Sequence, residues 1–214
     1  MKKILLLLLF PSITWAQSNI SFGGTFGGNL STIIDTADYE YMPGLNLGAF
    51  IIWGPVEHWG FTGGLNYSME GAKYSYISAD YSVDAKTNLS YLRIPLTVTY
   101  FLNKFDNPIR PKIFLGPGFG FLLGGKTKSD VTLHGQNTTS EVEAKDYING
   151  FDFGVEGGIG WNFRLSESGT WLNIDATFYR GLVDISKNND QNNYNQHISL
   201  NAGITIPLGY AKPE

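Results

Sequence analysis

Residues 90–102 read SYLRIPLTVTYFL, and their polarity alternates along the chain. One parity is apolar, at Leu92, Ile94, Leu96, Val98 and Tyr100. The other parity is polar, at Arg93, Thr97 and Thr99. Because successive side chains of a β-strand point to opposite faces of its sheet, this pattern predicts a strand with one aliphatic face and one polar face that carries an arginine. One face must meet an apolar medium, and the other must accommodate a charge.

Seven further segments alternate in the same way, which gives eight predicted strands, each long enough to cross a bilayer at a tilt. Their approximate bounds are 20–31, 43–54, 58–70, 87–102, 110–123, 150–164, 169–182 and 196–209. The connections after the odd-numbered segments are long and polar, whereas those after the even-numbered segments are short. Outer-membrane barrels alternate long extracellular loops with short periplasmic turns. The sequence therefore predicts an all-β fold, an eight-stranded antiparallel up-and-down transmembrane β-barrel with both termini in the periplasm.

The two faces of the predicted strands decide between a membrane barrel and a soluble one. In the last segment the aliphatic side chains of Ile198, Leu200 and Ile204 alternate with Ser199, Asn201 and others. We expect the uniformly aliphatic face to meet lipid and the polar face to line the lumen. A soluble lipocalin-like ligand carrier is the alternative, and it requires the reverse arrangement. In lipid every backbone polar group needs a partner, so the sheet is expected to close.

The chain begins MKKILLLLLFPSITWA, which combines two lysines, a short apolar run and small residues before a cleavage site. This is the plan of a secretory signal peptide, so residues 1–16 are predicted to be a signal peptide and residues 17–214 the barrel domain, located in a bacterial outer membrane. The chain has no cysteine, which excludes thiolate metal sites and disulfides. Its net charge of −4 indicates no basic surface for nucleic acid. No cofactor is expected.

Tryptophan placement supports the membrane interpretation. Four tryptophans lie at strand ends beside the short turns, at Trp53, Trp59, Trp161 and Trp171. Because indole and phenol rings favour the membrane interface, we expect these four to form the periplasmic aromatic girdle. Trp171 falls on the inward parity of its strand, so its place in the girdle requires a bulge. The candidates for the outer girdle are Tyr67, Phe121, Phe151 and Phe178.

Four charged residues fall on inward parity and are predicted to form a polar network inside the barrel: Arg93, Lys112, Glu156 and Asp175. Unpaired charges in a narrow lumen are costly, so two cations and two anions are expected to pair. Many glycines share this parity, and they leave room for long side chains from other strands. An eight-stranded lumen is normally filled by side chains, so no open pore is expected. Pro95, Pro117 and Pro207 lie within strands, where we expect bulges.

Two features near the predicted outer rim bear on function. His197 is the one histidine placed where a rim enzyme acting on lipid or peptide could use it, and this catalytic role is the alternative to a non-enzymatic barrel. The longest connection, residues 124–149, alternates at Val131 and Leu133 and again at Val142 and Ala144. It is predicted to extend two strands as a hairpin that turns around HGQN, with an edge to which a protein partner could add a strand.

Several short motifs together resemble one family, the PorT-like outer-membrane β-barrel proteins of Bacteroidetes. The motifs are GGNLS (27–31), YLRIPL (91–96), FLGPGFGFLL (114–123) and YRGLVDI (179–185). The resemblance covers nearly all of the mature chain and implies an eight-stranded outer-membrane barrel without a settled activity. We therefore expect a structural or interaction role, either the display of surface loops or an accessory part in an envelope or secretion assembly, with the lipid bilayer and an extracellular protein as partners.

Overall fold

The computed structural model of the protein describes residues 19–34, 39–188 and 192–208. Within these residues the chain forms nine β-strands and one short helix. In chain order they are β1 (Asn19–Ile34), β2 (Glu40–Val56), β3 (Trp59–Ile77), β4 (Tyr81–Phe101), β5 (Ile109–Leu133), β6 (Gln136–Glu143), α1 (Ala144–Tyr147), β7 (Phe151–Arg164), β8 (Trp171–Gly181) and β9 (Tyr194–Pro207). The predicted signal peptide, residues 1–16, lies outside the described residues. Across the described ranges, no helix has the length and apolar character needed to cross a membrane.

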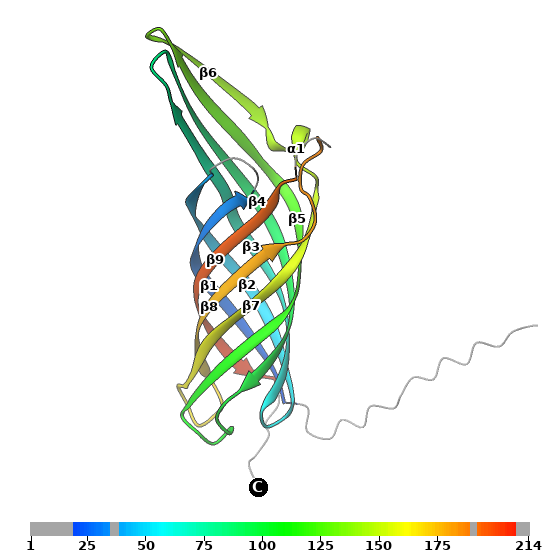
Figure 1. Cartoon of the computed structure of the whole chain (residues 1–214). Coiled ribbons are helices and arrows are strands. Elements are labelled where there is room, and N and C mark those ends of the chain that lie inside the picture. The colour runs from blue at the N-terminus through cyan, green and yellow to red at the C-terminus, as the bar shows by residue number, and fades with distance from the viewer. Residues whose placement is uncertain (1–18, 35–38, 189–191, 209–214) are drawn as a thin grey trace, which may run out of the picture.

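Eight of the strands close into a ring. Consecutive strands pair antiparallel in the order β1, β2, β3, β4, β5, β7, β8, β9, and β9 pairs back with β1. Figure 1 shows these strands winding around a common axis at a tilt. Because each ring strand has a neighbour on both sides, the backbone ladder has no free edge in the barrel. The predicted eight-stranded antiparallel barrel is confirmed. Strands β1 to β5 run longer than the predicted segments, whereas β7 and β8 are slightly shorter.

Burial alternates along the strands with the predicted parity. On β9, Leu200 is exposed while Ser199 is buried, and on β4, Leu96 is exposed while Arg93 and Thr97 are buried. The outward apolar side chains of β4 run from Leu92 to Leu102, about 33 Å along the strand and about 25 Å in height at a tilt of about 40°. This is the height of the lipid-facing band of such barrels. A lipocalin-like arrangement is therefore wrong for this chain, because the apolar face is the outer one.

Strands β3, β4 and β5 continue beyond the ring and form, together with β6, an extended sheet at the top of Figure 1. The hairpin of β5 and β6 turns at His134 and Gly135, which both have positive φ angles, as predicted around HGQN. The connection between β3 and β4 was expected to be a long polar loop. Instead, β3 and β4 form a regular hairpin that pairs up to Ile77 and Ser82, and β4 also pairs with β5 there. The residues of this hairpin alternate only weakly between apolar and polar, so the sequence pattern predicts a loop. Pairing with the neighbouring strands nevertheless makes them part of the sheet.

The expectation of bulges at the strand prolines is wrong. Pro95 faces Gly118 and Pro117 faces Val155 without any change of register, and Pro207 pairs in continuous register with Ser21. Each proline lacks an N–H donor, which interrupts a ladder but adds no residue to the strand. The register shifts lie elsewhere, between β2 and β3 and at the step from Ser90 to Tyr91.

Candidate functional site

The upper half of the lumen is organised around Arg93, which β4 points inward. Its Nε and Nη2 atoms donate to the two carboxylate oxygens of Glu70 on β3, at 2.8 and 2.5 Å. Its Nη1 atom donates to Oδ2 of Asp152 on β7, at 2.6 Å. All three side chains are buried, with exposed fractions of 5%, 1% and 0%. The planar guanidinium is suited to this geometry because it binds one carboxylate with two parallel donors and keeps a third donor for another.

Aromatic rings hold the guanidinium on both sides. The rings of Tyr91 and Tyr179 each lie 4.4 Å from the Arg93 guanidinium carbon. Glycines make the space for this stack. A Cβ atom on Gly120 would collide with the guanidinium, and one on Gly154 would collide with the Tyr179 ring. The inward glycines of β5 and β7 are therefore explained by the size of the side chains opposite them.

Strand β9 completes the cluster. The Asn195 side-chain amide donates to the Tyr91 hydroxyl at 3.1 Å and to Oδ2 of Asp152 at 2.8 Å. His197 stacks on Tyr179 with 5.0 Å between ring centroids, and its Nδ1 atom lies 3.5 Å from Glu70. His197 is only 5% exposed. The predicted rim position of His197 is wrong, because its side chain points into the lumen and is covered there.

A small apolar cluster closes the outer end of the lumen. It joins strand residues to α1 and to the segment after β8, through Ile33, Ala72, Leu89, Tyr91, Ala144, Ile148 and Ile185. The short helix is fixed by the backbone bond from Ile148 to Ala144 and by the bond from Asn149 to the Ile185 carbonyl. This cluster covers the Arg93 ion pairs from the extracellular side. It therefore seals the lumen with apolar side chains above charged ones.

The middle of the lumen contains a second ion pair and two small cavities. Lys112 on β5 lies 2.9 Å from the Asp175 carboxylate on β8. Cavities of about 90 and 40 Å³ share several lining residues, among them Thr25, Asn66 and Glu156. The smaller cavity is lined by polar side chains, whereas Phe50, Ile52 and Phe114 also line the larger one. Both have room for water molecules. Glu156 lines both cavities, and no ion pair or hydrogen bond of its carboxylate is found among the described residues.

The four residues of the predicted interior network do lie in the lumen, but they belong to separate clusters. Lys112 and Asp175 pair with each other as a separate unit. Arg93 pairs with Glu70 and Asp152 instead of with Glu156 or Asp175. Glu70 was missed because it stands at the end of its predicted strand. Glu70 shares its parity with Asn66 and Ser68, and this pattern predicts that its side chain points into the lumen.

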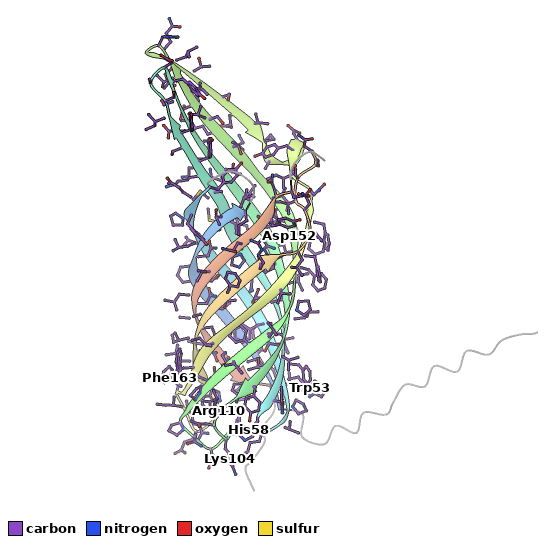
Figure 2. The ribbon with its side chains drawn as sticks, in the orientation of Figure 1. Trp53, His58, Lys104, Arg110, Asp152 and Phe163 are labelled. Atoms are coloured by element: carbon purple, nitrogen blue, oxygen red, sulfur yellow. The ribbon has the colours of Figure 1, made fainter. Side chains whose placement is uncertain are left out.

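A third cluster closes the end of the barrel near the short turns. The Arg110 guanidinium lies over the ring of Phe101 at 4.0 Å and also faces Phe105 and Trp171. It donates to the backbone carbonyl of Glu57 at 2.6 Å. Figure 2 labels Arg110 at the lower end of the barrel. Cationic and aromatic side chains therefore fill this end of the lumen as well.

This cluster corrects the predicted aromatic girdle at one position. Trp53, Trp59 and Trp161 are exposed and stand near the strand ends beside the short turns, with Trp53 46% exposed. Figure 2 labels Trp53 at the lower end of the barrel. Trp171 is only 5% exposed and packs its ring against Phe105. Its strand has no bulge there, since its pairing with Arg164 and with Thr205 continues the register of β8. Trp171 is therefore part of the lower plug and not of the girdle.

A closed ring of tilted antiparallel strands, apolar outside and polar inside, defines an outer-membrane β-barrel. The chain belongs to the family described as "Outer membrane protein beta-barrel domain", whose model matches residues 15–187. The outer membrane is accordingly its location. A search of curated proteins finds no match.

Several solved structures are similar in fold. One is Ail, the attachment invasion locus protein of Yersinia pestis, at 16% identity and a TM-score of 0.41, covering 89% of this chain and 100% of that one. Neisserial surface protein A matches at 12% identity and a TM-score of 0.46, covering 87% and 97%. The outer membrane enzyme PagL matches at 15% identity and a TM-score of 0.37, covering 88% and 99%.

Proposed function

We propose that this barrel is a sealed, non-enzymatic membrane anchor that carries an extracellular β-sheet as an interaction platform. The observation that carries the proposal is the contrast between the two parts of the molecule. The lumen is filled by three buried clusters, around Arg93, Lys112 and Arg110. The strands β3 to β6, in contrast, continue beyond the ring as a regular sheet. A plugged barrel offers no wide path for solutes, whereas a rigid sheet outside the membrane presents backbone and side chains to a partner.

Conductance tests the sealed barrel directly. The purified mature protein, refolded into planar bilayers, is expected to show no stable channel openings, because the buried clusters occupy the lumen. A variant with Arg110 and Trp171 replaced by alanine tests whether the lower plug contributes to the seal. Stable openings of the wild-type protein at moderate voltage would contradict the proposal.

The free edge of β6 is the best-supported contact for a protein partner. β6 pairs only with β5 among the described strands, and all eight of its residues are exposed. An unpaired edge offers N–H and C=O groups to which an extended segment can add. Long connections are extracellular in this class of barrel, so this edge faces the outside of the cell.

Site-specific crosslinking in intact cells tests that contact. A photoreactive side chain at Thr138 or Ser140 is expected to give a discrete crosslinked species, and the same group at Ser166 in a short turn is the matched control. With the photoreactive group at Ser140, Thr139→Pro should abolish the species while the barrel remains heat-modifiable. Residue 139 is a non-hydrogen-bonded partner of Asp130, so its N–H faces the free edge and proline removes that donor. Identical crosslinking of the proline variant would argue against strand addition.

We further infer that the chain is one of the PorT-like barrels of Bacteroidetes and serves as an accessory part of an envelope or secretion assembly. The motifs at residues 27–31, 91–96, 114–123 and 179–185 support this inference. Deletion of the protein should then alter the set of secreted or surface-exposed proteins. An unchanged secreted and surface protein profile would leave only the anchor role.

A further inference from the structure

A row of lysines crosses the outer face of the extended sheet. Lys73 on β3 is the cross-strand partner of Lys86 on β4, and Lys86 is the partner of Lys128 on β5. The row ends in an acidic residue on each side, Glu40 on β2 and Glu141 on β6. Like charges placed directly opposite each other destabilise a sheet. The row therefore contains two unfavourable like-charged pairs, Lys73 with Lys86 and Lys86 with Lys128.

Within the part of the chain that the structure describes, two of these lysines form no ion pair. Lys128 lies 3.3 Å from Asp130, but no ion pair of Lys73 or Lys86 is found within 4.0 Å among the described residues. The neighbouring Lys126 is paired with Glu141 at 2.6 Å. The centre of the row therefore has positive charge that is available to an anion.

The row lies just beyond the lipid-facing belt. Met69 is the last exposed apolar residue on the outer face of β3 before the row, and Lys73 follows four residues later. Four residues span about 13 Å along a strand, or about 10 Å in height at a tilt of about 40°. Lysine side chains can bend their charged ends back toward an interface. The ammonium groups therefore reach the headgroup layer of the outer leaflet.

A surface hollow of about 400 Å³ connects the belt to the row. Its lining includes Met69 and Ser90 at the lipid side and Asn88, Lys126 and Lys128 at the outer side. It also includes two carboxylates, and both are paired within the protein, Glu141 with Lys126 and Glu70 with Arg93. The hollow thus has an apolar residue on its membrane side and hydrogen-bond donors on its outer side. This arrangement suits an amphipathic ligand whose acyl chains lie along the barrel.

We propose that this surface binds the phosphorylated headgroup of an outer-leaflet glycolipid of the lipid A class. The phosphates lie against Lys73, Lys86 and Lys128, and the sugar occupies the hollow beside Asn88 and Ser90. The anion relieves the repulsion along the lysine row, so lipid binding and the stability of the extended sheet are coupled. The site borders β6 through Glu141 and the lumen through Glu70, but it uses neither the backbone edge of β6 nor the ion pairs of Arg93.

Retention of purified lipid A by the detergent-solubilised mature protein, measured by native mass spectrometry, tests the proposal. Diphosphoryl lipid A should bind the wild-type protein, and dephosphorylated lipid A should bind much more weakly. The variant K73Q/K86Q/K128Q should lose affinity by about fivefold for each lysine, on the order of 100-fold in total. The variant K73R/K86R/K128R keeps the charge and should retain most of the binding.

The matched control is K104Q/K145Q/K187Q, which removes three exposed lysines outside the row and should bind lipid A as the wild type does. Heat-modifiability of each variant reports whether the barrel has folded, and K86Q alone serves if the triple variant does not fold. Equal affinity of K73Q/K86Q/K128Q and its control would overturn the proposal. Binding that does not depend on the phosphates would also overturn it.

Discussion

Removing the charge of Arg93 is expected to destabilise the barrel strongly. Arg93→Leu leaves Glu70 and Asp152 buried, with exposed fractions of 1% and 0%, and deprives them of three charge-assisted hydrogen bonds. Breaking a buried ion pair by removing one partner costs about 3–5 kcal/mol, because an uncompensated charge remains in a medium of low dielectric constant. The free energy of unfolding should fall by about that amount.

Urea unfolding of the protein in detergent, followed by tryptophan fluorescence, measures this loss. With a slope of about 1–3 kcal/mol per molar urea, the midpoint should fall by about 1–5 M. Arg180→Leu is the matched control, since Arg180 is only partly buried and donates to Gln196 at 3.2 Å; its cost should stay below about 1 kcal/mol.

A further variant separates lost charge pairing from lost volume. Replacing Arg93, Glu70 and Asp152 together by leucine or methionine removes every charge of the cluster. This triple replacement should cost less than Arg93→Leu alone, because no buried charge is left unpaired. A loss below about 1 kcal/mol for Arg93→Leu, or a larger loss for the triple replacement, would refute the reasoning.

Three more predictions follow from the plugs, the glycines and the hairpin. Lipids that carry bromine on their acyl chains should quench the fluorescence of Trp53 but not of Trp171, as measured with single-tryptophan variants. Equal quenching of the two would show that Trp171 faces the membrane and belongs to the girdle. Gly120→Ala should lower the free energy of unfolding by about 1–3 kcal/mol, measured by urea titration, because its methyl group collides with the interior arginine. The hydrogen bond and charge of Lys126 hold the pKa of Glu141 below its usual value. A lowered pKa means that the pair stabilises the hairpin at neutral pH and that this contribution is lost as the pH falls through the pKa. Lys126→Gln removes the partner, so the pKa of Glu141 should rise toward its usual value in an NMR titration. An unchanged pKa would contradict the pairing.

The three lumen clusters share one physical principle. In each, a cation meets anions, carbonyl groups or aromatic rings from other strands. Glycines opposite Arg93 and Lys112 leave the room that these long side chains need. Because the surrounding wall is closed and lipid lies outside it, the polar groups of the lumen must find partners within it. The narrow lumen therefore becomes a packed polar core, which is consistent with the proposed role as an anchor.

The sequence by itself determined the barrel and which face of each strand meets lipid. Strand alternation is a local property of period two, so a segment such as SYLRIPLTVTYFL shows which face is aliphatic without reference to any other strand. The rhythm of long and short connections then set an even number of strands. Both inferences need only neighbours in the chain.

Only the tertiary structure decided which residues meet. Arg93 pairs with Glu70, 23 residues before it, and with Asp152, 59 residues after it. Parity places these side chains in the lumen, but register and strand tilt determine the height at which each one lies. For the same reason Trp171 plugs the lower end and His197 lies buried beside Tyr179. The lysine row also exists only because three strands pair in register, which aligns Lys73, Lys86 and Lys128 across the sheet.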